Sequence, residues 1–175
     1  MAVLSSKQLP NEAILDFYNK QAYLGNEYVI GTDITAIASA NVETPLLYLI
    51  NPASNGVAGK NTGCFINIRK FSQATNVSAA TTIFRTYFNP TITANGTAAT
   101  PVNVRPGLGN SSSVLAYRGP SACANGTVVS QFAVNYQELD TSVLYILDPG
   151  QSLLVTGSTD TAGTKVLALL NYYEL

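Results

Sequence analysis

The fold is decided by a C-terminal stretch that reads Val143-Leu-Tyr-Ile-Leu-Asp-Pro-Gly-Gln-Ser-Leu-Leu-Val-Thr-Gly157. Residues 143–147 form an apolar run rich in strand-forming side chains. The turn after them is specified by Asp148-Pro149-Gly150, because proline fixes φ at the first corner and glycine accepts a positive φ at the second. Residues 152–156 then return as a second short strand. The stretch therefore predicts two strands joined by a sharp turn.

The chain ends in a further apolar run, residues 165–174. The segment before it, residues 157–163, is small and polar, so we expect an exposed loop there. In an extended strand, one face would carry Val166, Ala168, Leu170 and Tyr172, and the other Leu167, Leu169 and Tyr173. Because both faces are apolar, this strand is expected in the middle of a covered sheet or at a contact between subunits.

Short extended runs separated by turns fill the chain from Tyr28 onward, which is the pattern of an all-β sandwich. Residues 28–30 and 34–37 are expected to pair across a turn at residues 31–33. Further strands are expected at residues 43–50, 64–71, 81–88, 102–104, 114–117 and 128–136. A total of about eight to ten strands predicts an antiparallel two-sheet β-sandwich of the jelly-roll type. Residues 25–175 would form this single domain.

The N-terminal residues 1–24 form a separate arm in this interpretation. A short helix is predicted at residues 10–20, because Pro10 or Asn11 can begin it and the side chains of Ile14, Phe17 and Tyr18 would share one face. A helix of about three turns is marginal in water on its own. Its apolar face must therefore pack on the protein's own core or on a partner chain, and the sequence leaves both alternatives open.

Charge is sparse. Charged residues make up 11% of the chain, against about 25% in an average domain. The net charge is −1 and the isoelectric point is about 5.2, so no basic field favours nucleic acid as a partner. Low net charge also weakens the repulsion between copies and permits dense self-association. We find no signal peptide and no apolar run of the roughly 18 residues that a membrane span needs, so synthesis in a cytoplasm is expected.

Groups that carry catalysis are few. The sequence has no histidine, so no Ser-His-Asp or Cys-His arrangement can form within one chain. Its 10 carboxylate side chains are scattered and form no calcium-binding or sugar-cleaving pattern. The two cysteines, Cys64 and Cys123, fit no zinc motif, and they are expected as two free thiols or as a disulfide formed after release. We therefore expect no enzymatic activity, no cofactor and no transition metal.

The 10 tyrosines are the most informative side chains, because tyrosine combines a large ring with a polar tip and suits interfaces. Each ring either packs inside its own sandwich or lines a contact between subunits. The candidate residues for an interface with a partner chain or a second copy are Leu9, Pro10, Ile14, Phe17, Tyr18, Tyr23, Tyr172 and Tyr173.

An ordered series of turn and strand motifs resembles a known class of proteins. The series comprises Asn51-Pro52 with a Gly-rich turn, Phe65-Ile-Asn-Ile-Arg-Lys-Phe71, Ala99-Thr-Pro-Val-Asn103, and Leu147-Asp-Pro-Gly-Gln-Ser-Leu153 before residues 166–174. Over residues 43–175, the chain is similar to capsid decoration (cement) and head-fibre proteins of tailed bacteriophages. The resemblance implies a jelly-roll-like sandwich, commonly trimeric, that binds the outside of a phage head and stabilises it.

This resemblance leads to a specific functional hypothesis. We expect a homotrimer on the virion surface, with the major capsid protein as partner and the N-terminal arm as anchor. Three arms on one trimer would raise the avidity roughly 10²-fold or more above that of a single arm. The alternative is a carbohydrate-binding or receptor-binding module of a phage fibre, with a glycan as ligand. The absence of tryptophan argues against sugar stacking.

Overall fold

The computed structural model describes residues 23–52, 67–75, 80–108, 111–124, 126–135 and 141–174. For residues 67–75, 122–124, 135 and 141–144 the description covers the backbone alone. The helix predicted at residues 10–20, Cys64 and the side chain of Cys123 lie outside the described part of the chain, so the expected state of the two cysteines stays a prediction. Tyr23 and Leu24 are helical, and Gly25, with φ 73°, ends this turn before the first strand.

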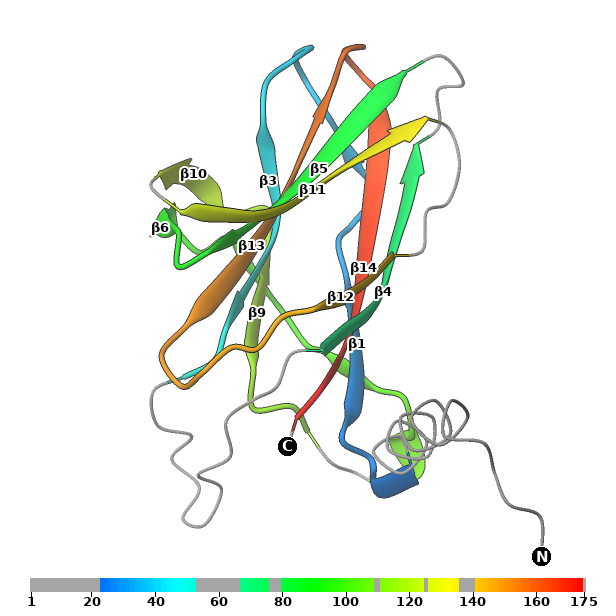
Figure 1. The fold of residues 1–175 in the computed structure, drawn as a ribbon, viewed down its shortest axis with the longest axis vertical. Coiled ribbons are helices and arrows are strands. Elements are labelled where there is room, and N and C mark those ends of the chain that lie inside the picture. The colour runs from blue at the N-terminus through cyan, green and yellow to red at the C-terminus, as the bar shows by residue number, and fades with distance from the viewer. Residues whose placement is uncertain are drawn as a thin grey trace, which may run out of the picture.

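Fourteen strands and one short 3-10 helix are present in the described part of the chain. The strands are β1 (Glu27–Gly31), β2 (Thr35–Ala36), β3 (Thr44–Ile50), β4 (Asn67–Thr75), β5 (Thr81–Phe88), β6 (Thr91–Ala94), β7 (Thr97–Ala99), β8 (Val102–Asn103), β9 (Leu115–Arg118), β10 (Ser121–Ala124), β11 (Thr127–Asn135), β12 (Thr141–Leu144), β13 (Ser152–Thr159) and β14 (Lys165–Tyr173); η1 spans Pro106–Leu108. They form two six-stranded antiparallel sheets and a two-stranded ribbon (Figure 1). The predicted all-β antiparallel sandwich is thus confirmed.

The strands pair as one long hairpin that is folded over itself. β1 pairs with β14, β3 with β13, β4 with β12, β5 with β11, β6 with β10, and β7 with β9. Each pair lies inside the previous pair along the sequence, and the first four pairs alternate between the two sheets. This nested pairing is a jelly-roll topology, as the sequence predicted.

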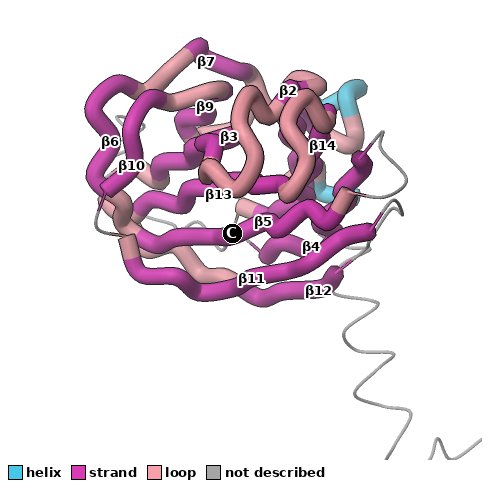
Figure 2. The backbone as a smooth tube through the Cα atoms, turned by 90° about the horizontal axis from the view of Figure 1, so that it is seen from above, coloured by secondary structure: helices cyan, strands magenta, loops and turns pink. Residues whose placement is uncertain are grey.

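The two sheets face each other around one apolar core. The first sheet has the order β12-β4-β14-β1-β8, with β2 also on β14, and the second has the order β11-β5-β13-β3-β9-β7. The β6–β10 ribbon lies on the outer side of the second sheet (Figures 1 and 2). Core side chains come from both sheets and include Ile30, Leu47, Phe84 and Tyr172. Removing this apolar surface from water is the main favourable term in folding.

Strand β14 lies in the interior of the first sheet, between β4 and β1. Its inward face from Val166 to Tyr172 is buried, while Leu167 and Leu169 on the outer face are half-buried. The prediction of a central, covered last strand is therefore confirmed.

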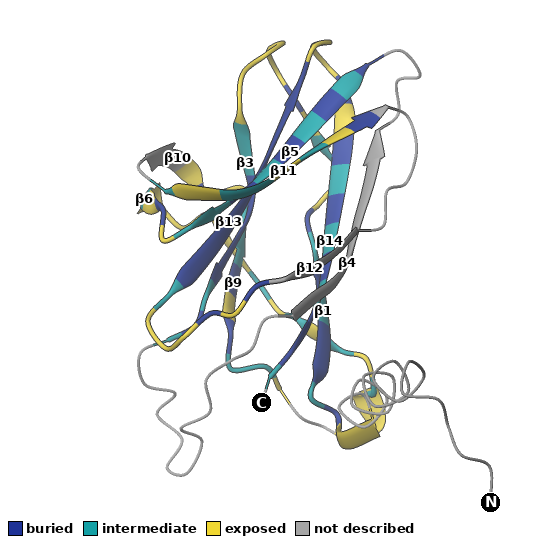
Figure 3. Ribbon diagram, in the orientation of Figure 1, coloured by how far each residue is buried: buried dark blue, intermediate teal, exposed yellow. Residues whose placement is uncertain are grey.

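Strand β13 extends further than the sequence predicted. All of its residues are buried (Figure 3), and the loop expected at residues 157–163 begins only after Thr159. Gly157 permits this close packing, because a Cβ at that position would lie 3.0 Å from Leu46 Cδ1. The Thr164 hydroxyl donates to the Thr161 carbonyl at 2.7 Å. The loop prediction was wrong for residues 157–159 because small polar residues can be buried in a strand whose backbone groups are paired.

The predicted pairing of residues 28–30 with residues 34–37 is also wrong. β1 and β2 both pair with β14 and not with each other. Between them, the Thr32 backbone N–H donates to Ala168 O at 2.8 Å, and Ala168 N–H donates to Thr32 Oγ1 at 3.0 Å. These bonds keep the chain running along β14, so no hairpin reversal occurs at residues 31–33.

The turn at Asp148-Pro149-Gly150 forms as predicted. Gly150 has φ 88°, and Gln151 N–H donates to Asp148 O at 3.0 Å. The flanking strands β12 and β13 belong to opposite sheets, so the turn carries the chain across the sandwich. Asn51 is fully buried beside it and donates from Nδ2 to Leu147 O at 2.8 Å.

Candidate interaction surface

The predicted interface residues fall into three groups: residues outside the described part of the chain, an exposed residue, and buried residues. Leu9, Pro10, Ile14, Phe17 and Tyr18 lie outside the described residues. Tyr23 is 69% exposed, whereas Tyr172 and Tyr173 are 0% and 1% exposed. Only Tyr23 among the described three thus presents its ring at the surface.

Tyr172 belongs to the interior of the sandwich. Its ring stacks on that of Tyr28 with 5.7 Å between centroids, and its hydroxyl lies 2.6 Å from Ser112 Oγ. Since Tyr172 and Tyr173 have no exposed ring surface, we assign both to the protomer's own packing and not to a contact between subunits.

Glu174 fastens the loop before β9 to the end of β14. Its carboxylate accepts from the Ser113 backbone N–H at 3.0 Å, from Ser113 Oγ at 2.8 Å and from Ser112 Oγ. Charge-assisted hydrogen bonds of this kind are stronger than neutral ones. The clamp therefore fixes the loop from which Leu115 begins β9.

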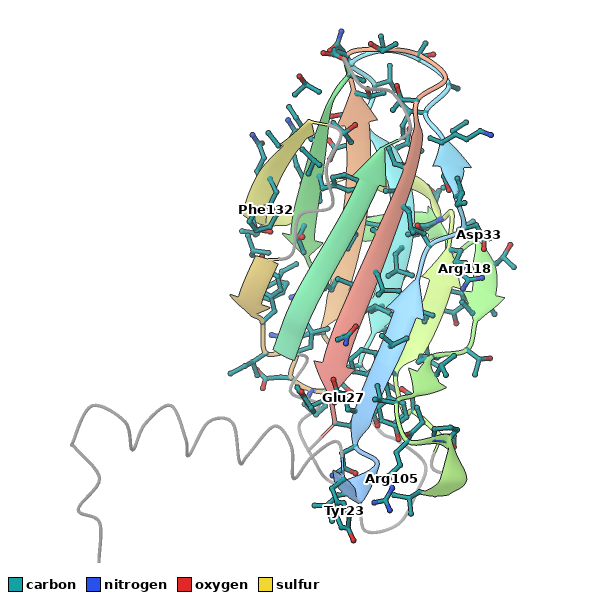
Figure 4. The ribbon with its side chains drawn as sticks, turned by 90° about the vertical axis from the view of Figure 1, so that its right-hand side faces the viewer. Tyr23, Glu27, Asp33, Arg105, Arg118 and Phe132 are labelled. Carbon is teal, nitrogen blue, oxygen red and sulfur yellow. The ribbon has the colours of Figure 1, made fainter. Side chains whose placement is uncertain are left out.

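Arg105 joins Tyr23 to the segment after β8. The guanidinium carbon lies 4.3 Å from the Tyr23 ring centroid, a cation–π geometry, and Nη1 also donates to Tyr23 O. Asn103 Oδ1 accepts from the Arg105 backbone N–H at 2.7 Å, and Asn103 Nδ2 donates to Gly25 O at 2.7 Å. The exit point of the N-terminal arm is thus held to β8 by several contacts at the lower end of the molecule (Figure 4).

Several large apolar side chains are exposed on or beside the strands at one edge of the sandwich. They are Tyr23, Val102 (61% exposed), Val104 (49%), Leu108 (43%) and Leu115 (47%), and we call these five residues the edge surface. Val102 lies on β8, an edge strand of the first sheet, and Leu115 lies on β9 near the β7 edge of the second. Strands β11 and β12 lie on the opposite side of the molecule from β7 and β9 (Figure 2). Exposed apolar residues mark an interaction site where they form a contiguous patch.

A small pocket of about 230 Å³ lies beside Leu115. Its walls include Ala98, Pro101, Val114, Leu115 and Tyr117. The pocket connects Leu115 to Pro101, which precedes Val102. It is smaller than the roughly 300–1,000 Å³ typical of sites for drug-sized ligands.

A polar cluster lies elsewhere, on the outer side of the second sheet. Glu43 accepts from Tyr87 Oη at 2.7 Å and from Thr156 Oγ1, and its second oxygen lies 3.6 Å from Arg85 Nη1. Arg85 Nε also donates to Gln131 Oε1 at 2.8 Å. These groups join three strands, β5, β11 and β13, to Glu43 just before β3, so the cluster stabilises the sheet. Within the described residues, no three His, Cys, Asp or Glu side chains are grouped to hold a metal, and no helix is long and apolar enough to span a membrane.

The sequence found only one member of the edge surface, Tyr23. Val102, Val104, Leu108 and Leu115 were missed because each lies in or beside a short element, where single apolar residues create no period. Their exposure depends on which strands end at an edge, and this follows from long-range pairing.

No family model and no curated protein matches this chain. Among solved structures, it is similar to one of Desmodium yellow mottle tymovirus, with 9% identity, a TM-score of 0.21, and coverage of 85% of this chain and 81% of that chain. It is also similar to an aminopeptidase from the marine sediment archaeon Thaumarchaeota archaeon, with 11% identity and a TM-score of 0.19; the match covers 85% of this chain and 24% of that one. Both scores are too low to support a functional assignment.

Proposed function

We propose that this protein is a structural virion protein that binds the outside of a bacteriophage head as a homotrimer and stabilises it. The observation that carries the proposal is the nested strand pairing from β1 with β14 to β7 with β9. This is the jelly-roll architecture that the resemblance to decoration and head-fibre proteins implies. The ordered turn motifs behind that resemblance include Asn51 and Asp148, which meet at one turn of the sandwich.

The surface chemistry is compatible with this role. The chain has a net charge of −1 and only 11% charged residues, so copies packed densely on a shell repel one another weakly. The edge surface offers an apolar contact on one side of each copy. We propose no reaction and no cofactor for the protein.

The carbohydrate-binding alternative receives less support. Sugar stacking needs an open aromatic face, and Tyr23 is the one exposed aromatic ring among the described side chains. Arg105 already lies over that ring. We therefore place the glycan-binding module second.

The test is to locate the protein on particles. Antibodies raised against the purified chain are applied, with gold labels, to phage particles produced by the host whose genome carries the gene. The proposal expects many labels per head and few on tails, and heads lacking the protein should rupture at lower temperature. Particles without label would refute the virion role. Label confined to tail tips, together with binding on a glycan array, would favour the receptor-binding module.

A further inference from the structure

The β6–β10 ribbon crosses the outer face of the second sheet. At one end β6 follows β5 and β10 leads to β11, and at the other end β6 leads to β7 and β9 leads to β10. The order of this sheet is β11-β5-β13-β3-β9-β7, so β13 and β3 lie between the two ends of the ribbon. The ribbon therefore passes over these two strands, on the left of the molecule in Figures 1 and 2.

Two large side chains lie on the outer face beneath this crossing. Leu49 and Leu153 belong to the core between the sheets, so the alternation of side chains along β3 and β13 turns their neighbours Tyr48 and Leu154 to the outer face. Tyr48 and Leu154 are register partners, and they are 8% and 0% exposed. An outer face of an antiparallel sheet is commonly solvated, so the burial of Leu154 fits a ribbon that is closed over it.

The same row of side chains continues on both sides of the ribbon's path. Tyr87 on β5 pairs with Leu154, and Tyr117 on β9 pairs with Tyr48. Both flanking tyrosines are half-buried, and the ring centroids of Tyr48 and Tyr117 are 6.3 Å apart. These four side chains thus form a contiguous row across four neighbouring strands, and the ribbon covers the middle of the row.

The ribbon is a small unit of structure. Its two strands have four residues each and, within the described strands, pair only with each other. Three of the four side chains of β6 are exposed, and Ile92 is half-buried. A two-stranded hairpin is marginally stable by itself in water. The closed position therefore depends on the apolar surface that the ribbon buries.

Residues with a left-handed backbone stand at the corners of the ribbon. Asn89 has φ 47°, Gly96 has φ 86° and Gly119 has φ 57°. The backbone N–H of Asn89 donates to Ser152 O at 2.9 Å, and that of Gly119 donates to Leu46 O at 3.0 Å. At both corners, the anchored nitrogen precedes the bond about which φ rotates. A change of φ can therefore move the ribbon while its anchors stay on the sheet, which is how a few hinge residues allow larger elements to move.

We propose that the β6–β10 ribbon is a hinged strap that opens by local unfolding while the two sheets stay folded. In the closed form it buries Leu154 and Tyr48. In the open form it presents the row from Tyr87 to Tyr117 as an apolar surface that the closed protein lacks. Units with few buried apolar contacts open at a smaller cost in free energy than the whole domain. The inference goes beyond the proposed virion role and does not rest on it.

Thiol labelling at two adjacent positions of β13 tests the strap in the full-length chain. The background carries Cys64→Ser and Cys123→Ser, and it receives either Leu154→Cys beneath the ribbon or Leu153→Cys in the core; both leucines are 0% exposed. A maleimide reagent in native buffer should label Leu154→Cys about tenfold faster or more, because Leu153→Cys is reached only by global unfolding. Since Cys123 belongs to β10, hydrogen exchange at residues 91–94 verifies that the background keeps the ribbon.

Two glycine variants separate hinge movement from general destabilisation. Gly119 and Gly163 both have positive φ, and a Cβ at either position would meet open space. Gly119→Ala strains the closed form, and opening releases the strain. Labelling of Leu154→Cys should therefore rise roughly 5- to 30-fold, the factor that corresponds to the left-handed penalty of an L-residue. Gly163→Ala in the turn between β13 and β14 keeps its strain in the open form, so it should leave this rate unchanged.

Equal labelling rates for the two thiols would overturn the strap, because both positions would then be reached by global unfolding. Labelling of Leu154→Cys as fast as that of Val128→Cys, at a position that is 51% exposed, would also overturn it, because nothing would cover residue 154. Equal acceleration by the two glycine variants would refute the hinge. Hydrogen exchange checks the unsubstituted chain: residues 91–94 should exchange faster and with less dependence on urea than residues 153–155, and an equal dependence would rule out local opening.

Discussion

Strand β13 and the edge surface contain the same kinds of side chain, yet one is covered and the other is not. Leu153, Leu154 and Val155 on β13 are at most 1% exposed, whereas Val102 and Leu115 are 61% and 47% exposed. β13 is flanked by β3 and β5, while β8 pairs only with β1 among the described strands. Apolar composition therefore predicts that a segment will be covered. The position of the segment in the sheet decides whether other strands of the same chain bury it.

The largest loss of stability is expected for a substitution in the buried core between the two sheets. Phe84 on β5 is fully buried between the sheets, so Phe84→Ala should lower the free energy of unfolding by about 3–5 kcal/mol. Urea denaturation followed by circular dichroism measures the change. The exposed Val128→Ala should change it by no more than about 0.5 kcal/mol. A cost below about 1 kcal/mol for Phe84→Ala would mean that the two sheets do not pack as described.

Two glycines with positive φ differ in the space that surrounds their Cα atoms. Gly96 has φ 86°, and a Cβ there would overlap the Arg118 carbonyl oxygen; Gly163 has φ 80° and open space around it. Both substitutions to alanine carry the left-handed backbone penalty of roughly 1–2 kcal/mol. Gly96→Ala should cost about 1–3 kcal/mol more, because the neighbouring strand must move. Equal losses for the two variants in thermal or urea unfolding would contradict the described β6–β7 turn.

The Glu174 clamp links the core end of β14 to the loop that leads into the edge surface. Glu174→Ala removes the charged acceptor for the half-buried Ser112 and Ser113, and we expect a loss of about 1–2 kcal/mol. Glu174→Gln keeps one oxygen acceptor and should lose less. Hydrogen exchange should show faster exchange of the Ser113 backbone amide in the alanine variant. Unchanged protection at that amide would show that the clamp does not hold the loop.

The sequence predicted strand positions well where the signal is local. Residues 81–88 alternate and end at Asn89-Pro90, and the structure has β5 at Thr81–Phe88. The turn at Asp148 was also predicted, because its three residues specify their own backbone angles. Pairing partners were not predictable in this way: β1 and β2 lie beside β14, whose residues follow them by more than 120 positions. Which apolar residues remain at an edge depends on those partners, so the edge surface could not be derived from local pattern.

The smallest expected effect on stability comes from the edge surface, and the effect there should fall on association. Val102 is 61% exposed, so Val102→Asp should change the free energy of unfolding of one copy by no more than about 0.5 kcal/mol. If copies of the proposed homo-oligomer meet at this edge, an aspartate there would be desolvated without a partner, which is costly. Light scattering at micromolar concentration should then report a smaller assembly than for the unsubstituted protein. Val128→Asp, also exposed but on the opposite edge, is the matched control and should keep the original mass. If Val128→Asp dissociated the protein while Val102→Asp did not, copies would meet along β11, and the apolar edge would have to be covered by something other than a second copy.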